Sequence, residues 1–477
     1  MKNLSVYLIA AACSFSPLFA SGTALLDSKA RFHPVISETG MVVSQEIIAS
    51  QVGADILSAG GNAVDAAVAT GFALAVTLPR AGNLGGGGFM LVHLAEADKT
   101  IAIDYREMAP DEAHRDMFLD LEGDVDNNKA RYSIESSGVP GTVAGLIHAQ
   151  EKYGLLKLKQ VMQPAIALAR GGFAVSADLS DSLKSRSQRL QQDSASKVYF
   201  YKPGGDSYEL GETLIQTELG ATLARIANGG REEFYQGKTA DLIVAQMEAS
   251  GGLISHQDLV NYQVVERQPV CGDYKKTRVC TMPPPSSGGV HLVQMLNILE
   301  GWDLKGLGHN SADYIHRLVE SMRRAYADRS LYLGDPDFFP VPVAQLTDKK
   351  YATVLRDQID PLRSSRSVNI KPGLGETGLS PQATKESTET THFSTWDQWG
   401  NVVSNTYTLN FSYGSGISVT GAGFLLNNEM DDFSSKPGSP NGYGLVGGIA
   451  NSIEPGKRPL SSMTPTIAFD AGGKPIL

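Results

Sequence analysis

A threonine pair lies where the chain changes from a polar stretch to a strand-like pattern, and such a threonine can act as a nucleophile. The junction reads Glu389-Thr390-Thr391-His392. A threonine hydroxyl is a weak nucleophile near neutral pH and needs a base to take its proton. If the chain is cut before Thr390, the new α-amine, with an ordinary pKa of about 7.7–8.0, can serve as that base. Threonine pairs are also common in strands, so spacing alone leaves a structural interpretation open.

Other kinds of catalytic site have less support in the sequence. The nine histidines are scattered, without the H-x-H, H-E-x-x-H or C-x-x-C spacing of metal sites, so we expect no metal. The run Leu84-Gly85-Gly86-Gly87-Gly88-Phe89 lacks the Lys-Ser/Thr of a P-loop and the spacing of a dinucleotide fingerprint. Its glycines allow close approach to a ligand or to a neighbouring strand, and we favour the strand. No G-x-S-x-G elbow is present, and His392 fits a structural strand position better than a base.

Two strands must position the threonines. Residues 391–396 alternate between apolar and polar with a period of two, 397–401 have turn composition, and 402–409 alternate again, which predicts a hairpin. The preceding segment, 371–389, has no apolar period, and we expect it to be flexible and exposed. One more strand is predicted over 464–469.

Helices and strands alternate in the rest of the chain. A helix opens at Ser44, and Asn62 caps a second one over 63–78. Strands are predicted over 89–94 and 100–104, and the chain from about 140 to 265 is mostly helical. A later helix begins after Asn310 or Ser311, and four apolar residues at core spacing are expected to face the interior: Ile315, Leu318, Val319 and Met322.

The N-terminus and the overall charge predict where the protein acts. Residues 1–24 have the charged start, the apolar centre and the small-residue site (Gly22-Thr23-Ala24) of a signal peptide, so we expect a periplasmic or secreted protein. A lipoprotein site at Cys13 is the weaker alternative. The net charge is −10 with no basic block, which argues against nucleic acid and anionic membrane surfaces as partners.

Export changes how two of the three cysteines are interpreted, because disulfides persist in oxidising compartments. The stretches 268–274 and 277–281 look like strands. If Lys275-Lys276 is a two-residue turn, Cys271 lies opposite Cys280 in a non-hydrogen-bonded pair, where side chains are closest. A disulfide and two buried thiols both remain open.

The junction at Thr390 resembles the processing site of bacterial γ-glutamyltranspeptidases, and the similarity extends over almost the whole chain after the signal. Many separate motifs in one order carry it. They are Gly60-Gly61-Asn62-Ala63-Val64-Asp65-Ala66, Asn83-Leu84-Gly85-Gly86-Gly87-Gly88-Phe89, Tyr105-Arg106-Glu107-Met108-Ala109-Pro110, Gly138-Val139-Pro140-Gly141-Thr142, Met282-Pro283-Pro284-Pro285-Ser286-Ser287-Gly288-Gly289, Asp328-Arg329-Ser330, residues 427–433 and Arg458-Pro459-Leu460-Ser461-Ser462-Met463.

The resemblance implies an α+β Ntn-hydrolase fold, an αββα four-layer sandwich, in a precursor that cuts itself into a large subunit (25–389) and a small one (390–477). It implies γ-glutamyl transfer and hydrolysis of glutathione and other γ-glutamyl compounds, with water, amino acids or peptides as acceptors and no cofactor. Thr390 matches the nucleophile, and Thr408 the hydroxyl that supports its amine. The substrate residues are Arg106, Ser461 and Ser462 for the α-carboxylate, Asn410, Glu429 and Asp432 for the α-ammonium, and Tyr443 on a lid loop of about 437–448.

The chain also departs from the family's pattern. The region from Thr390 to Leu477 is about half as long as the family's small subunit, and no Gly-Ser-Pro-Gly-Gly segment for the oxyanion hole follows Ser462. We therefore expect an incomplete small subunit. Two hypotheses follow: an enzyme of γ-glutamyl transfer and hydrolysis, with a related acylase as a minor variant, or an inactive homologue that does not mature and at most binds γ-glutamyl ligands.

Overall fold

The computed structural model describes residues 36–375 and 390–477. Residues Thr39–Leu477 form one compact unit. The predicted signal peptide and most of the predicted flexible segment, residues 376–389, lie outside the described residues. Within the described ranges, no helix has the length and apolar character needed to cross a membrane.

An antiparallel six-stranded sheet occupies the centre of this unit and combines strands from before and after Thr390. Thr391 to Asp397 and Val402 to Thr408 form the predicted hairpin and pair in register from Val402–Trp396 to Tyr407–Thr391. The order across the sheet is β1 (Gly40–Val43), β9 (Thr391–Asp397), β10 (Val402–Thr408), β2 (Gly87–Leu94), β3 (Lys99–Tyr105) and β6 (Val265–Arg267).

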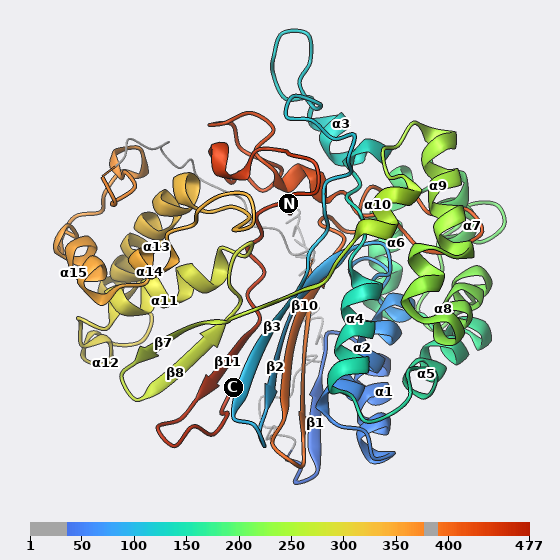
Figure 1. Ribbon diagram of the computed structural model, residues 1–477, viewed down its shortest axis with the longest axis horizontal. Coiled ribbons are helices and arrows are strands. Elements are labelled where there is room, and N and C mark those ends of the chain that lie inside the picture. Colours follow the sequence, from blue (N-terminus) through green and yellow to red (C-terminus); the bar gives the residue numbers. More distant parts are fainter. Residues whose placement is uncertain (1–35, 376–389) are drawn as a thin grey trace, which may run out of the picture. The chain divides into compact units, whose positions relative to one another are not determined.

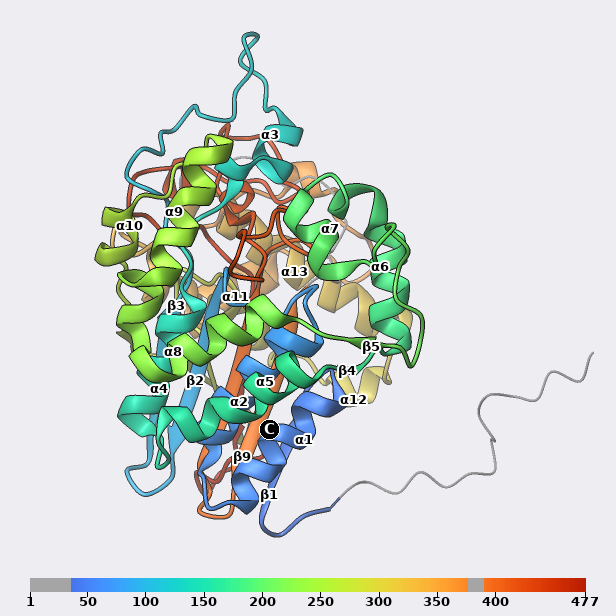
Figure 2. The ribbon, with the colours of Figure 1, turned by 90° about the vertical axis from the view of Figure 1, so that its right-hand side faces the viewer.

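Helices cover one face of this sheet, on the right in Figure 1 and in front of the strands in Figure 2. They are α1 (Ile47–Ser58), α2 (Ala63–Thr77), α4 (Thr142–Tyr153), α5 (Leu158–Gly171) and α8 (Thr217–Tyr235). Every residue of α2 is buried, because this helix lies between the sheet and the outer helices. Its small side chains allow that close packing, and the Asn62 side chain caps it in a box with Asp65, as predicted.

Shorter elements complete this side of the molecule. The helices are α3 (Asn127–Tyr132), α6 (Ala177–Leu190), α7 (Ser194–Phe200), α9 (Lys238–Ser250) and α10 (His256–Asn261), and a two-stranded sheet joins β4 (Phe173–Ala174) and β5 (Thr213–Leu214). The prediction of a mostly helical region from about 140 to 265 is confirmed.

A second sheet packs against the other face of the large one. It consists of β11 (Thr466–Phe469), β8 (Thr277–Thr281) and β7 (Val270–Tyr274). A buried apolar cluster that includes Phe89, Leu91, Cys280 and Ile467 lies between the two sheets. The second sheet is covered in turn by α11 (Gly288–Leu299), α12 (Leu304–Leu307), α13 (Ala312–Tyr332), α14 (Val343–Leu346) and α15 (Lys349–Asp357).

Strand β2 shows why the chain folds as a sandwich. Met90 and Val92 face the helical core, whereas Phe89 and Leu91 face the second sheet, so both faces of the strand are apolar. Such a strand is stable only when both faces are covered. The order helices, sheet, sheet, helices confirms the expected four-layer αββα fold.

The cysteine alternative is settled in favour of the disulfide. The β7–β8 hairpin turns at Lys275-Lys276, and Cys271 pairs with Cys280 in register. The two sulfur atoms are bonded.

Two helix predictions need correction. Helix α1 begins at Ile47 rather than Ser44, because the Glu46 side chain accepts from the N–H groups of Ile48 and Ala49 and caps the helix there. In α13 the expected core face is wrong: Ile315 and Val319 are exposed, and the buried side is mostly polar. Arg324 pairs with Glu320 at 2.9 Å and donates to three backbone carbonyls, which makes burial of that polar face possible.

Candidate active site

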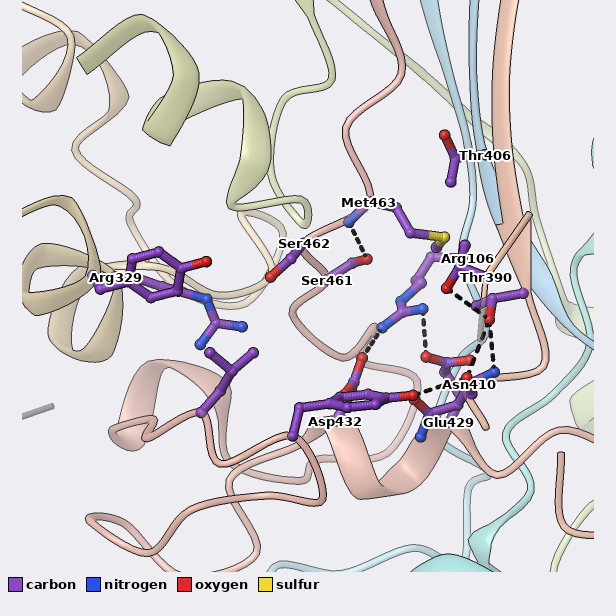
Figure 3. Close-up of a pocket in the computed structure, with 14 residues that line it drawn as sticks. Arg106, Arg329, Thr390, Thr406, Asn410, Glu429, Asp432, Ser461, Ser462 and Met463 are labelled. Atoms are coloured by element: carbon purple, nitrogen blue, oxygen red, sulfur yellow. Dashed lines mark hydrogen bonds and ion pairs between the residues drawn. The ribbon is translucent and has the colours of Figure 1, made fainter. Parts of the chain in front are cut away.

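A cavity of about 380 Å³ opens where the ends of β9 and β10 meet the loops after β3 and before β11. Figure 3 shows its lining side chains converging from both sides. All nine residues proposed from the sequence line it: Arg106, Thr390, Thr408, Asn410, Glu429, Asp432, Tyr443, Ser461 and Ser462. They come from parts of the chain more than 350 residues apart, which only the folded sheet brings together.

Thr390 lies at the right-hand side of the cavity in Figure 3, directly before β9. Its Oγ donates to the Oγ of Thr408 at 3.3 Å, and the Asn410 backbone N–H donates to the same Thr408 oxygen at 2.9 Å. The backbone of Thr408 is held in place as well, because Asn83 Nδ2 donates to its carbonyl oxygen at 2.9 Å. The hydroxyl of Thr390 is therefore held by a well-anchored neighbour and still faces the cavity.

The glycine run of residues 85–88 packs closely against the end of β10. A Cβ at Gly86 would lie 2.0 Å from the Thr408 carbonyl oxygen, so only glycine allows the two backbones to approach this closely. Gly87 and Gly88 form the first residues of β2 and pair with Thr408 and Tyr407. The interpretation as a strand contact rather than a phosphate cradle is confirmed.

Arg106 forms the centre of a buried charge cluster. The residue is 0% exposed, and its guanidinium makes ion pairs of 2.5 Å to Glu429 and 2.6 Å to Asp432. Burial raises the pKa of Glu429 well above its ordinary value, and burial likewise raises that of the adjacent Glu107 to about 7, against the opposing charge of Arg106. One guanidinium and two carboxylates of the cluster therefore lie at the cavity wall.

Ser461 and Ser462 form part of the wall above this cluster. They are positioned by the Pro283–Gly289 loop: the Ser461 N–H donates to the Pro285 carbonyl at 2.8 Å, and the Ser287 N–H donates to the Ser461 carbonyl at 2.7 Å. The buried Ser461 hydroxyl accepts from the Met463 N–H at 3.0 Å, whereas the Ser462 side chain is exposed to the cavity. The proline-rich loop thus holds the backbone of Ser461 in place.

The predicted lid loop contributes Tyr443 and Leu445 to the cavity lining. The Tyr443 hydroxyl donates to the Asn410 carbonyl at 2.8 Å, and Asn441 Nδ2 donates to Asp432 at 3.1 Å. The Gly442 N–H donates to the carboxylate of Asp431 at 2.9 Å. Two of these three hydrogen bonds therefore connect the loop to lining residues, and the third connects it to the neighbouring Asp431.

Further lining residues were missed in the sequence: Tyr326, Arg329, Thr406, Leu445 and Met463. Two of them, Arg329 and Met463, stand within motifs that carry the family resemblance, so that signal was available. His392 is not among the lining residues; its ring nitrogens are hydrogen-bonded to Thr406 and Ser394, which fits the expected structural role. Within 36–375 and 390–477, no group of three His, Cys, Asp or Glu side chains could hold a metal ion.

Comparisons with known proteins agree with this geometry. The profile of the family described as Gamma-glutamyltranspeptidase matches residues 49–477. The "Glutathione hydrolase proenzyme" of Escherichia coli (strain K12) is 53% identical over 442 residues, which are 92% of this chain and 75% of that protein.

Two solved structures are similar as well. The Helicobacter pylori gamma-glutamyltranspeptidase has a TM-score of 0.71 at 45% identity and covers 72% of this chain and 98% of its own. A cephalosporin acylase from Bacillus halodurans has a TM-score of 0.77 at 27% identity, over 95% of this chain and 80% of its own.

Proposed function

Because this chain belongs to the gamma-glutamyltranspeptidase family, we propose that its cavity holds a γ-glutamyl group against the Thr390 hydroxyl. The chain is a proenzyme of γ-glutamyl hydrolysis and transfer, and its substrates are glutathione and related γ-glutamyl compounds. An inactive homologue is not favoured at 53% identity to a glutathione hydrolase proenzyme. The observation that carries the proposal is the Thr390–Thr408 hydroxyl pair at the edge of a cavity lined by Arg106, Glu429 and Asp432.

Maturation is the first step of the proposed mechanism. Cleavage between Glu389 and Thr390 separates a large subunit (25–389) from a small one (390–477) and frees the α-amine of Thr390. That amine can take the proton of its own hydroxyl. Thr408 is within hydrogen-bonding distance of this hydroxyl, at 3.3 Å, and supports its orientation.

The substrate is held through the two charged groups on its α-carbon. In this proposal Arg106, Ser461 and Ser462 bind the α-carboxylate, while Asn410, Glu429 and Asp432 bind the α-ammonium. A guanidinium and hydroxyls suit a carboxylate, and carboxylates suit an ammonium group. Tyr443, which donates to the Asn410 carbonyl, would hold the lid over the bound group. The clamp accelerates the reaction chiefly by fixing the γ-carbonyl near Thr390.

The reaction proceeds through an ester intermediate. Thr390 Oγ attacks the γ-carbonyl carbon, the amide C–N bond breaks, and the amine leaves with the proton that the α-amine took from the hydroxyl. Water then attacks the γ-glutamyl ester and releases glutamate, or the amine of an amino acid or peptide attacks and receives the γ-glutamyl group. The residues 1–24 support export of this enzyme to the periplasm or beyond.

The experiment that tests the nucleophile combines a denaturing gel, N-terminal sequencing of each band and a γ-glutamyl-p-nitroanilide assay. The wild-type protein should give a small band that begins at Thr390 and should release p-nitroaniline. Thr390→Ala should remain uncut and inactive. Thr391→Val is the matched control, because the Thr391 hydroxyl has no hydrogen-bond partner among the described residues and should be dispensable. A band that begins elsewhere, or an active Thr390→Ala protein, would refute the assignment.

A further inference from the structure

Arg329 is a buried cation in the cavity that forms no ion pair with a described carboxylate. It lies on α13 and is 4% exposed. Four other arginines of the described ranges are less than a tenth exposed, and each has a carboxylate within ion-pair distance: Arg80, Arg106, Arg324 and Arg458. For Arg329 the described residues offer no carboxylate within 4.0 Å; its Nε donates to the Ser287 hydroxyl at 3.2 Å.

An arginine in this position is energetically unfavourable unless something compensates its charge. Burial lowers the pKa of Arg329, and the positive charge of Arg106 lowers it further, against the attraction of Asp432. The guanidinium nevertheless stays protonated in proteins, so its charge has to be compensated electrostatically. Since Arg329 lines the cavity, an anionic group of a ligand can supply that compensation.

The arrangement of the cavity identifies the ligand group. In Figure 3 the guanidinium of Arg329 and the hydroxyl of Thr390 lie at opposite ends, with Ser462 between Arg329 and Arg106. A γ-glutamyl group whose γ-carbonyl lies at Thr390 directs its α-carbon away from Thr390, toward the end with Ser462 and Arg329. An amine leaving group departs from the γ-carbon and is therefore on the Thr390 side.

The other arginine has few donors left for a carboxylate. Arg106 uses one terminal nitrogen for Glu429 and the other for Asp432, and its Nε donates to the Pro459 carbonyl at 3.2 Å. The terminal nitrogens of Arg329, in contrast, have no carboxylate partner among the described residues. We propose that Arg329 binds the substrate α-carboxylate together with Ser462, as a second guanidinium at the carboxylate end of the site.

Ser287 connects Arg329 to the serine loop. Its hydroxyl accepts from Arg329 Nε, donates to the Ser461 carbonyl at 2.9 Å and lies 3.4 Å from the Ser462 hydroxyl. Arg329 and Ser462 are thus fixed to one anchor and present their donors to the same region. This inference rests on the proposed function and adds a binding residue to it.

The test measures binding and turnover separately. Arg329→Gln and Arg329→Lys are compared with Arg317→Gln, which removes one positive charge from the same helix at a site that does not line the cavity. Calorimetry measures binding of L-glutamate and of its α-amide, L-isoglutamine. A charge-assisted hydrogen bond contributes about 1.5–3 kcal/mol, so Arg329→Gln should weaken glutamate binding about 10- to 150-fold and isoglutamine binding less than about 3-fold. Arg329→Lys should restore part of the loss, and Arg317→Gln should change neither affinity.

Turnover distinguishes the α-carboxylate from a carboxylate of the leaving group. Both glutathione and γ-glutamyl-p-nitroanilide carry the α-carboxylate, but only glutathione has a second carboxylate, in its leaving group. If Arg329 binds the shared α-carboxylate, Arg329→Gln should raise KM about equally for the two substrates. An effect on glutathione alone, unchanged glutamate affinity, or equal losses for glutamate and isoglutamine would overturn the proposal. Failure of the wild-type protein to release p-nitroaniline would count against the chemistry at Thr390, whereas the calorimetric comparison still decides the role of Arg329.

Discussion

The close contact between Gly86 and Thr408 leads to a quantitative prediction for Gly86→Ala. The new Cβ would lie 2.0 Å from the Thr408 carbonyl oxygen, and real Cβ contacts are essentially never shorter than 3.0 Å. The two backbones must therefore separate by about 1 Å. Asn83 donates to that same oxygen, so the displacement also disturbs the anchor of Thr408. Because the Thr408 hydroxyl is 3.3 Å from that of Thr390, a shift of this size is enough to break their hydrogen bond.

The expected loss follows from that displacement. A misplacement of about 1 Å in a catalytic group can reduce the rate ~100-fold, and overpacking of this kind reduces the free energy of unfolding by about 1–3 kcal/mol. Maturation should slow to a similar degree as turnover, because both use the Thr390 hydroxyl. The assays are the time course of small-subunit appearance on a denaturing gel and kcat/KM for γ-glutamyl-p-nitroanilide.

Gly171→Ala is the matched control for this substitution. Gly171 is the last residue of α5, and a Cβ built there meets nothing within 4 Å, so alanine should leave activity unchanged and the protein as stable or slightly more stable. If Gly86→Ala matures and turns over within about 2-fold of the wild-type protein, the close contact does not position Thr408 and the reasoning fails.

Three further predictions concern charge, covalent structure and pH. Arg106→Met should lower the free energy of unfolding by about 3–5 kcal/mol in urea titrations, because it leaves buried carboxylates unpaired. Adding Glu429→Gln should recover part of that loss. If the double variant instead loses as much stability as the two single variants together, the prediction is wrong. Replacing Cys271 and Cys280 by serine should cost ~2–3 kcal/mol, since their bond closes a short loop, while turnover at 25 °C stays within about 2-fold. Burial raises the pKa of Asp431 to about 6, above its unfolded value. The stability that Asp431 contributes is therefore largest at low pH and is lost as the pH rises through 6. Asp431→Asn should flatten the decrease in the free energy of unfolding that the wild-type protein shows between about pH 4 and 7.

The sequence predicted best those features that depend on neighbouring residues. The Asn62 cap, the hairpin after Thr390 and the facing cysteines each follow from local spacing, and each is confirmed. The buried face of α13 did not follow in this way. Helical periodicity counts apolar side chains, whereas Glu320 and Arg324 are buried as an ion pair whose remaining donors reach carbonyls on other segments.

The candidate site shows the same limit. The family resemblance supplied the residue types around Thr390, and the structure brings them to one cavity. The sequence could not indicate that Arg106 is already paired with Glu429 and Asp432 while Arg329 has no carboxylate partner among the described residues, because both facts depend on contacts between distant segments. A residue inside a motif could be recognised, but its free or paired state could not.

The charges of the cavity also explain which ligands it should reject. The α-carbon of a γ-glutamyl group carries one negative and one positive charge, so its binding adds no net charge to the site. The carboxylate can pair with a guanidinium, and the ammonium can take the place that Arg106 leaves at Glu429 or Asp432. A ligand with only one of these groups leaves a buried charge or donor unpaired, which costs several kcal/mol. An unpaired buried charge weakens the binding of an analogue more than a satisfied ion pair strengthens the binding of a γ-glutamyl group. We therefore expect modest affinity for γ-glutamyl compounds and strong discrimination against analogues that lack the α-carboxylate or the α-ammonium.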